Sequence, residues 1–161
     1  MTKMLKLSSI FATAAGIMLC GGGIWGIYFT YQNVAREKIT TTADASMPNT
    51  PVKGPLTLKI QADTIRKHML ALTEGKTYAE MPRQIPKTDA EGNTVLDEQG
   101  QPVLIPNTLR DTWVTATALS TALNFAIITY VFSALLVLLG MISLWTGILF
   151  RKLSNQKTPR L

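Results

Sequence analysis

The stretch TWVTATALSTALNFAIITYVFSALLVLLGMISLWTGILF, from Thr112 to Phe150, decides the fold of this chain. No charged side chain occurs in it, and its second part, from Phe125 to Phe150, is almost wholly apolar. Such a run predicts a transmembrane helix, because about 20 apolar residues are needed to cross roughly 30 Å of hydrocarbon. At about 1.5 Å per residue the whole stretch would be roughly 58 Å long. We therefore expect the helix to continue outside the membrane.

A second uncharged run, from Leu7 to Ala35, predicts another membrane helix near the start of the chain. We assign transmembrane helices to residues 7–30 and 125–150. Three aromatic residues near the end of the first run form the belt that is typical of a membrane–water interface: Trp25, Tyr28 and Tyr31.

A cleaved signal peptide is the alternative for the first run, since Lys3 and Lys6 resemble the basic start of one. The apolar run is longer than the roughly 7–15 residues of a signal peptide. The small residues at Ala12 to Ala14 come too early for cleavage, and Cys20 follows Leu19, where lipoprotein processing requires a small residue. We interpret the run as an uncleaved anchor.

The charges place the two ends of the chain on one side of the membrane. All ten acidic residues, and ten of the sixteen Lys and Arg residues, lie between Arg36 and Asp111, so the net charge of +6 resides in the ends. Lys and Arg mark cytoplasmic segments, which predicts cytoplasmic residues 1–6 and 151–161 and an extracytoplasmic segment over residues 31–124. The basic pI of 9.6 then indicates membrane orientation, and nucleic acid is not expected as a partner.

The two membrane runs carry matching stripes of small residues, each with a period near 3.5 residues. The first stripe, with Leu19 as its one large member, is Ser9, Ala12, Gly16, Gly23, Gly26 and Thr30. The second, with Leu136 as its large member, is Ala126, Thr129, Ser133, Gly140, Ser143 and Gly147. Small side chains let helices approach closely in lipid, and this period favours left-handed packing. We predict an antiparallel hairpin of the two stripes; the alternative is that small residues are simply common in membrane helices.

The extracytoplasmic segment predicts short helices. Residues 36–55 resemble a linker, and apolar residues at helical spacing predict a helix over residues 57–73: Leu58, Ala62, Ile65, Met69 and Leu72. Gly75 suits the left-handed position that ends a helix. A T-x-x-E capping box then predicts a short helix over residues 77–81.

A small internal repeat follows, DAEGNTVL and then DEQGQPVL, over residues 89–104. Its Asp and Gly turns with paired Val-Leu predict a turn-rich, β-hairpin-like arm over residues 85–106. The alternative is an exposed loop without regular structure, since two strands alone are marginally stable.

The last helix begins with a stalk outside the membrane. Asn107 or Thr108 is expected to cap it, and the stalk is assigned to residues 108–124. One face of the stalk is predicted to pack on the helix over residues 57–73: Trp113, Ala116, Leu119 and Leu123.

Candidate residues for chemistry are few. The sequence contains one His and one Cys, no CxxC motif and no nucleotide-binding or hydrolase motif. Neither membrane run carries the buried Asp, Glu, His or Lys on which proton relays and ion sites depend. No catalytic, cofactor-binding or metal-binding residue is predicted. The alternative is an enzyme or ligand-binding protein with a site near Asp63, His68 and Tyr78.

The segment VKGPLTLKIQADTIRKHMLALTEGKTYAEMPR (residues 52–83), preceded by REKIT at residues 36–40, resembles a family of small actinobacterial two-span membrane proteins. The specific elements are Gly54-Pro55, Gln61-Ala62-Asp63, His68 and Gly75 to Met81. Members of this family often carry the label of aromatic ring-opening dioxygenases. The residues contradict that label, because such iron sites use two His and one carboxylate, and His68 is the only His.

The arrangement also resembles the small accessory subunit that accompanies the actinobacterial cytochrome bcc–aa3 respiratory supercomplex. The repeat over residues 89–104 departs from the shorter family pattern. This resemblance implies a non-catalytic role in assembly or stability of the III–IV complex, with cytochrome bc and oxidase subunits as partners and no cofactor of its own.

The sequence thus predicts an all-α membrane protein of the cell membrane. Its parts are a two-helix transmembrane hairpin, a small, mainly helical extracytoplasmic domain and a short β-hairpin-like arm. We expect an accessory subunit of a membrane complex. A self-associating envelope scaffold is a third hypothesis beside the extracytoplasmic enzyme.

Overall fold

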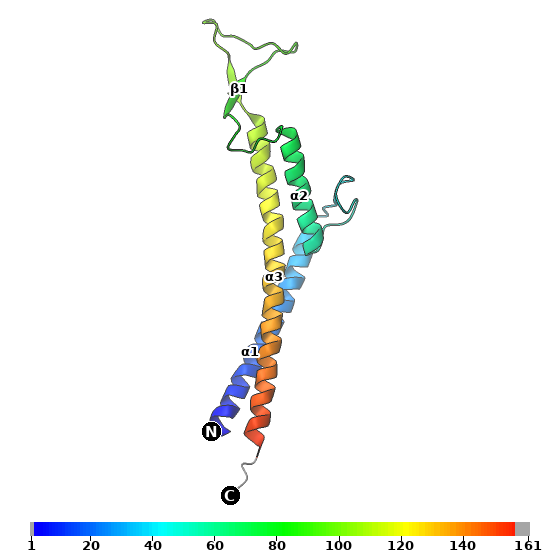
Figure 1. The fold of residues 1–161 in the computed structure, drawn as a ribbon, viewed down its shortest axis with the longest axis vertical. Coiled ribbons are helices and arrows are strands. Elements are labelled where there is room, and N and C mark those ends of the chain that lie inside the picture. The colour runs from blue at the N-terminus through cyan, green and yellow to red at the C-terminus, as the bar shows by residue number, and fades with distance from the viewer. Residues whose placement is uncertain (1, 157–161) are drawn as a thin grey trace.

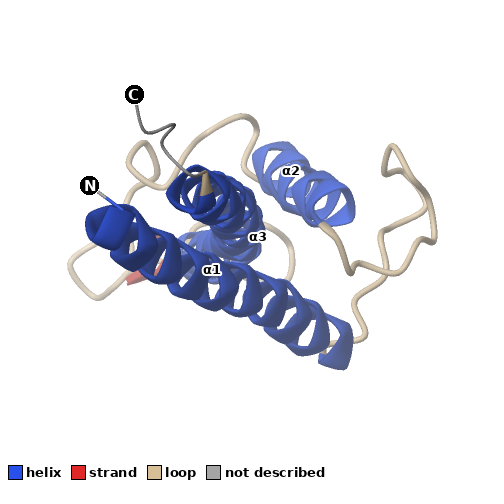
Figure 2. Ribbon diagram, turned by 90° about the horizontal axis from the view of Figure 1, so that it is seen from below, coloured by secondary structure: helices blue, strands red, loops and turns tan. Residues whose placement is uncertain are grey.

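A computed structural model describes residues 2–156 of the chain. The elements in order are α1 (Thr2–Arg36), α2 (Pro55–Leu72), β1 (Gln84–Pro86), β2 (Leu104–Pro106) and α3 (Thr108–Asn155). Helix α3 is the spine of an elongated molecule: α1 lies along its lower part and α2 along its upper part (Figure 1). A view from below shows α1 and α2 on different sides of α3 (Figure 2).

Helices α1 and α3 are each long and apolar enough to span a membrane. Only 11% of the most apolar 18-residue window of either helix is buried inside the molecule. A core helix of a water-soluble protein would be mostly buried, so this outward apolar surface fits contact with lipid. The fold is therefore mostly helical, with two candidate membrane spans and a small β-hairpin.

The predicted stripes of small residues pack on each other along α1 and α3. Buried positions recur every seven residues in both helices: Ser9, Gly16, Gly23 and Thr30 on α1, and Ser133, Gly140, Gly147 and Ser154 on α3. Three side-chain hydrogen bonds cross between the helices. Ser9 Oγ donates to the Gly147 carbonyl (2.7 Å), Ser143 Oγ to the Ala12 carbonyl (2.8 Å) and Cys20 Sγ to the Val137 carbonyl (3.7 Å).

The backbones approach most closely where glycines face the other helix. A Cβ added to Gly140 would lie 2.7 Å from the backbone nitrogen of Cys20 and 2.9 Å from the carbonyl oxygen of Gly16. Only glycine fits this spacing, because those are backbone atoms that cannot rotate away.

The segment between α1 and α2 is an ordered loop rather than a free linker. Its Val52 is only 1% exposed and packs with Leu58, which is fully buried, and with Tyr130 of α3. The Tyr130 hydroxyl donates to the Lys53 carbonyl (2.8 Å). The Val52 amide donates to the Ile39 carbonyl (2.9 Å), which closes the loop on itself. Val52, with Ile39 packed against the same cluster, and a set of hydrogen bonds thus hold a segment with no apolar periodicity.

Helix α2 begins at Pro55 after Gly54 and ends at Leu72, close to the predicted residues 57–73. It packs against the upper part of α3 through two groups of buried residues. The first joins Leu58 and Ala62 to Leu123, and the second joins Met69 and Met81 to Trp113.

The predicted stalk face is wrong at Leu119. Trp113 and Leu123 are buried and Ala116 is half-buried against α2, but Leu119 is 44% exposed and Ser120 occupies the packed position. Steps of three, four and three residues keep one face of a helix in register, and Leu119 lies about 100° away from Ser120.

The predicted helix over residues 77–81 is a single turn instead. The Thr77 amide does bond the Glu80 carboxylate (2.7 Å), as a capping box requires, and the Glu80 amide bonds the Thr77 carbonyl (3.1 Å). The turn stops there because Met81 precedes Pro82, which disfavours helical backbone, and because the Met81 side chain is drawn into the cluster with Trp113.

The arm is a β-hairpin stem that opens into two lobes at the top of the molecule (Figure 1). Strands β1 and β2 pair antiparallel, with Ile85 opposite Ile105. Above them, the residues at positions 87, 95 and 103 form a closed ring of three backbone hydrogen bonds of 2.7–2.9 Å. Each copy of the predicted repeat makes one lobe, in which the Asp89 or Asp97 carboxylate accepts from two backbone amides.

The ends of the long helices differ from the predicted boundaries. Helix α1 already includes residues 2–6 and continues to Arg36, and α3 runs without a break through the predicted stalk and span to Asn155. Asn107 caps α3 by accepting from the Leu109 amide (3.1 Å). Of the predicted tail over residues 151–161, residues 157–161 lie outside the described residues.

Candidate functional site

The three residues of the predicted enzyme site are not brought together. Asp63 pairs with Lys59 one turn earlier on α2. It also lines a cleft of about 230 Å³ between α2 and α3, which neither His68 nor Tyr78 lines. His68 lies five residues further along α2, so the two side chains point in directions about 140° apart. A shared catalytic site at these residues finds no support in their placement.

His68 instead holds the loop before α2. Its Nε2 lies 2.9 Å from the carboxylate of Asp44, which also accepts from Lys67 (3.0 Å) and from the Thr42 hydroxyl (2.7 Å). The Thr42 hydroxyl, the His68 ring and the Lys67 ammonium hold the pKa of the Asp44 carboxyl well below its usual range. Sequence reasoning missed Asp44, because it lies in the segment that resembles a linker.

Tyr78 lies beneath the guanidinium of Arg110, with 3.9 Å between the guanidinium carbon and the ring centroid. Arg110 also donates to the Met81 carbonyl (2.6 Å). This stacking is a cation–π contact, and it fixes the Tyr78 ring beside α3.

The fixed Tyr78 ring forms one wall of a groove of about 380 Å³ on the upper part of α3. We call this the stalk groove, and its lining residues are Tyr78, Trp113, Val114, Thr117 and Ala118. None of the lining side chains carries a charge, and Val114 is 52% exposed. The groove therefore offers an apolar surface that α2 leaves uncovered.

The surface around the stalk groove continues down α3 without interruption. No charged residue occurs on α3 between Asp111 and Arg151. Phe125, three helical turns below Val114 on the same side, is 69% exposed. A second helix that lies against the groove would meet the same uncharged face of α3 along its whole length.

A second cleft lies at the other end of the molecule, between the ends of α1 and α3 that carry the two termini. Lys6 and Arg151 flank it. Sequence reasoning used these two cations only to orient the chain, and the cleft between them follows from how the helices pack.

Among residues 2–156, no group of three or more His, Cys, Asp and Glu side chains is placed to hold a metal ion. Comparison with protein-family models, with curated proteins and with solved structures finds no match for this chain.

Proposed function

We propose that this protein is a non-catalytic accessory subunit of a multisubunit membrane complex and contributes to its assembly or stability. In this proposal α1 and α3 cross the cell membrane, both termini are cytoplasmic, and α2, the arm and the upper part of α3 lie on the outer face. The packing of α1 along α3 supports an uncleaved anchor, because a removed signal peptide would leave the glycine face of α3 without its partner.

The dimensions support this placement. About 20 residues cross the hydrocarbon, so a span that ends at Phe150 begins near Val131. The Tyr130 hydroxyl and the stacked rings of Trp25 and Phe29, whose centroids are 5.1 Å apart, then lie near the outer interface, where aromatic residues are enriched. Above Tyr130, α3 extends roughly another 30 Å.

The uncovered stalk groove is the single observation that carries the proposal. Outside the bilayer an apolar surface gains free energy when it leaves water, and a contiguous apolar patch marks an interaction site. The occupant that fits best is a membrane-spanning helix of another subunit that continues out of the bilayer, because the uncharged face of α3 extends from the groove into the proposed span.

The resemblance to the accessory subunit of the actinobacterial cytochrome bcc–aa3 supercomplex supports a respiratory partner. The groove is uncharged and mostly apolar and continues into the uncharged face of α3, which agrees with a helix of another subunit as its occupant and with a role in assembly. We propose cytochrome bc or oxidase subunits as the partners.

Copurification with matched variants tests the proposal. The full-length protein, tagged at its C-terminus, is extracted from its native membrane with a mild detergent, and bound proteins are identified by mass spectrometry. We expect cytochrome bc or oxidase subunits with the wild type and at least a tenfold loss with Ala118→Arg, which places a long charged side chain in the groove.

Thr112→Arg is the control, because Thr112 is also exposed on the upper part of α3 but does not line the groove. It adds the same charge and is expected to retain the partners. Absence of respiratory subunits from the wild-type sample would reject the respiratory assignment. Recovery of only further copies of this chain would support the self-associating scaffold instead.

A further inference from the structure

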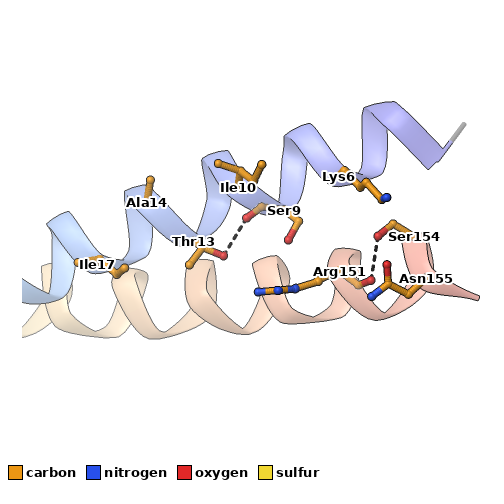
Figure 3. A pocket seen from close by; sticks show the side chains of 9 residues that line it. All are labelled: Lys6, Ser9, Ile10, Thr13, Ala14, Ile17, Arg151, Ser154 and Asn155. Carbon is orange, nitrogen blue, oxygen red and sulfur yellow. Dashed lines mark hydrogen bonds between the residues drawn. The ribbon is translucent and has the colours of Figure 1, made fainter.

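The cleft between the ends of α1 and α3 has the size of a ligand site. Its volume is about 580 Å³, within the range of about 300–1,000 Å³ that is typical of small-molecule pockets. Figure 3 shows that α1 and α3 diverge toward Lys6, which opens the cleft at its lower end. We call it the basic cleft.

Two cations from opposite helices flank the basic cleft. Lys6 extends from α1 toward α3, and Arg151 lies on α3 across the gap (Figure 3). No acidic side chain occurs in residues 1–36 or 112–161 of the sequence, so neither α1 nor the proposed span of α3 supplies a carboxylate to neutralise them. The cleft therefore favours an anion.

Apart from Asn155 at its lower end, the remaining wall of the cleft is effectively apolar. Ile10, Ala14 and Ile17 follow one another up α1 from Lys6. The hydroxyls of the lining residues already donate to carbonyls of the protein: Ser9 to Gly147, Thr13 to Ser9 and Ser154 to Arg151. A ligand of the cleft thus meets the Lys6 ammonium at the open end, the Arg151 side chain along α3 and hydrocarbon along α1.

The position of the cleft relative to the proposed membrane matches this separation of cations from apolar side chains. Lys6 immediately precedes the first uncharged run and Arg151 immediately follows the second. If α1 and α3 span a membrane, both cations lie at the level of the lipid headgroups and the isoleucines lie at the level of the acyl chains.

We propose that the basic cleft binds an anionic glycerophospholipid. Its phosphate pairs with the Lys6 ammonium and with the guanidinium of Arg151, an exposed side chain that turns from its course along α3 toward the headgroup, and one acyl chain lies along Ile10, Ala14 and Ile17. Basic pockets between membrane helices on the cytoplasmic side suit anionic headgroups. An acidic protein segment fits less well, because the wall offers few hydrogen-bonding groups. This inference depends on the two helices crossing a membrane, and it does not depend on which complex the protein joins.

Lipid binding to the full-length protein in a neutral detergent tests the inference. Native mass spectrometry measures bound phosphatidylglycerol and, separately, bound phosphatidylcholine. We expect tighter binding of phosphatidylglycerol, and a loss of roughly thirtyfold in the double variant Lys6→Gln/Arg151→Gln, since two cations near the headgroup are removed. Excess inorganic phosphate should displace little lipid, because the acyl chain contributes to binding.

Lys3→Gln/Lys152→Gln is the matched control. It removes the same charge from the same end of the molecule, but neither residue lines the cleft. We expect less than a threefold change. An equal loss in both double variants would overturn the inference in favour of diffuse surface attraction, and equal binding of the two lipids would overturn it as well. Loss of a protein partner without loss of lipid in the first variant would make the cleft a protein contact instead.

Discussion

Gly140→Ala is predicted to separate α1 from α3. The added methyl carbon would lie 2.7 Å from the Cys20 nitrogen and 2.9 Å from the Gly16 oxygen, whereas ordinary contacts begin at 3.4 Å. Both atoms belong to the backbone of α1, so the helices must move apart locally by roughly 0.7 Å.

Two effects determine how much Gly140→Ala lowers the free energy of separating α1 from α3. Overpacking a close contact costs about 1 to 3 kcal/mol. The same movement lengthens the hydrogen bonds from Ser143 to Ala12 and from Ser9 to Gly147, which measure 2.8 and 2.7 Å. Hydrogen bonds between membrane helices contribute about 0.6 kcal/mol each. We expect the free energy of separating the helices to fall by about 2 to 4 kcal/mol.

The single cysteine of the chain supplies the assay. Cys20 is half-buried, and its sulfur lies 3.7 Å from the Val137 carbonyl of α3. Pulse alkylation of Cys20 along an SDS titration in mixed micelles therefore measures separation of the two helices. Gly140→Ala should move the midpoint to lower SDS.

Gly22→Ala is the control for this experiment. A Cβ on Gly22 meets no atom within 4 Å, and alanine is favoured over glycine in a helix by up to about 1 kcal/mol. Its midpoint should stay unchanged or rise. If Gly140→Ala and Gly22→Ala give the same midpoint, the helices do not pack through Gly140 and the reasoning is refuted.

Three further predictions concern the parts outside the proposed spans. Tyr130→Phe removes the hydrogen bond to the Lys53 carbonyl and should destabilise the docked loop by about 1 kcal/mol, measured by hydrogen exchange of residues 37–54; unchanged exchange would contradict it. Hydrogen bonds from Thr42, His68 and Lys67 lower the pKa of Asp44 in the folded protein. The ionised Asp44 carboxylate therefore stabilises the docked loop above its usual pKa of 3.8, and this stabilisation is lost as the pH falls below that value. The same loop should exchange faster below pH 4 in the wild type, whereas Asp44→Asn should exchange faster already at pH 7 and lack this step. Gly92 has a φ of 90°, so Gly92→Ala should strain its lobe of the arm by about 1 to 2 kcal/mol and speed hydrogen exchange there. Gly54→Ala is the control, because Gly54 has a φ of −118°, which alanine adopts without strain. Equal hydrogen exchange of the lobe in the two variants would contradict the left-handed turn at Gly92.

The sequence by itself determined the features that depend on local composition and period. The uncharged runs predict the two long helices, and the seven-residue repeat of small side chains predicts the face through which they pack. The α2 helix and its ends follow from apolar spacing and from Gly54-Pro55 and Gly75. These predictions succeed because a helix brings residues three, four and seven positions apart onto one side, whatever the rest of the chain does.

Only the tertiary structure decided which distant side chains meet. Asp44 reaches His68 across 24 positions and Arg110 covers Tyr78 across 32, so two residues suspected of chemistry act as structural contacts. Ser120 replaces Leu119 on the packed face because α3 is one continuous helix, whose rotation about its axis must suit its contacts with both α1 and α2. Lys6 and Arg151 flank one cleft although they lie at opposite ends of the sequence. Such contacts depend on the relative register and rotation of whole helices, which no local pattern of residues encodes.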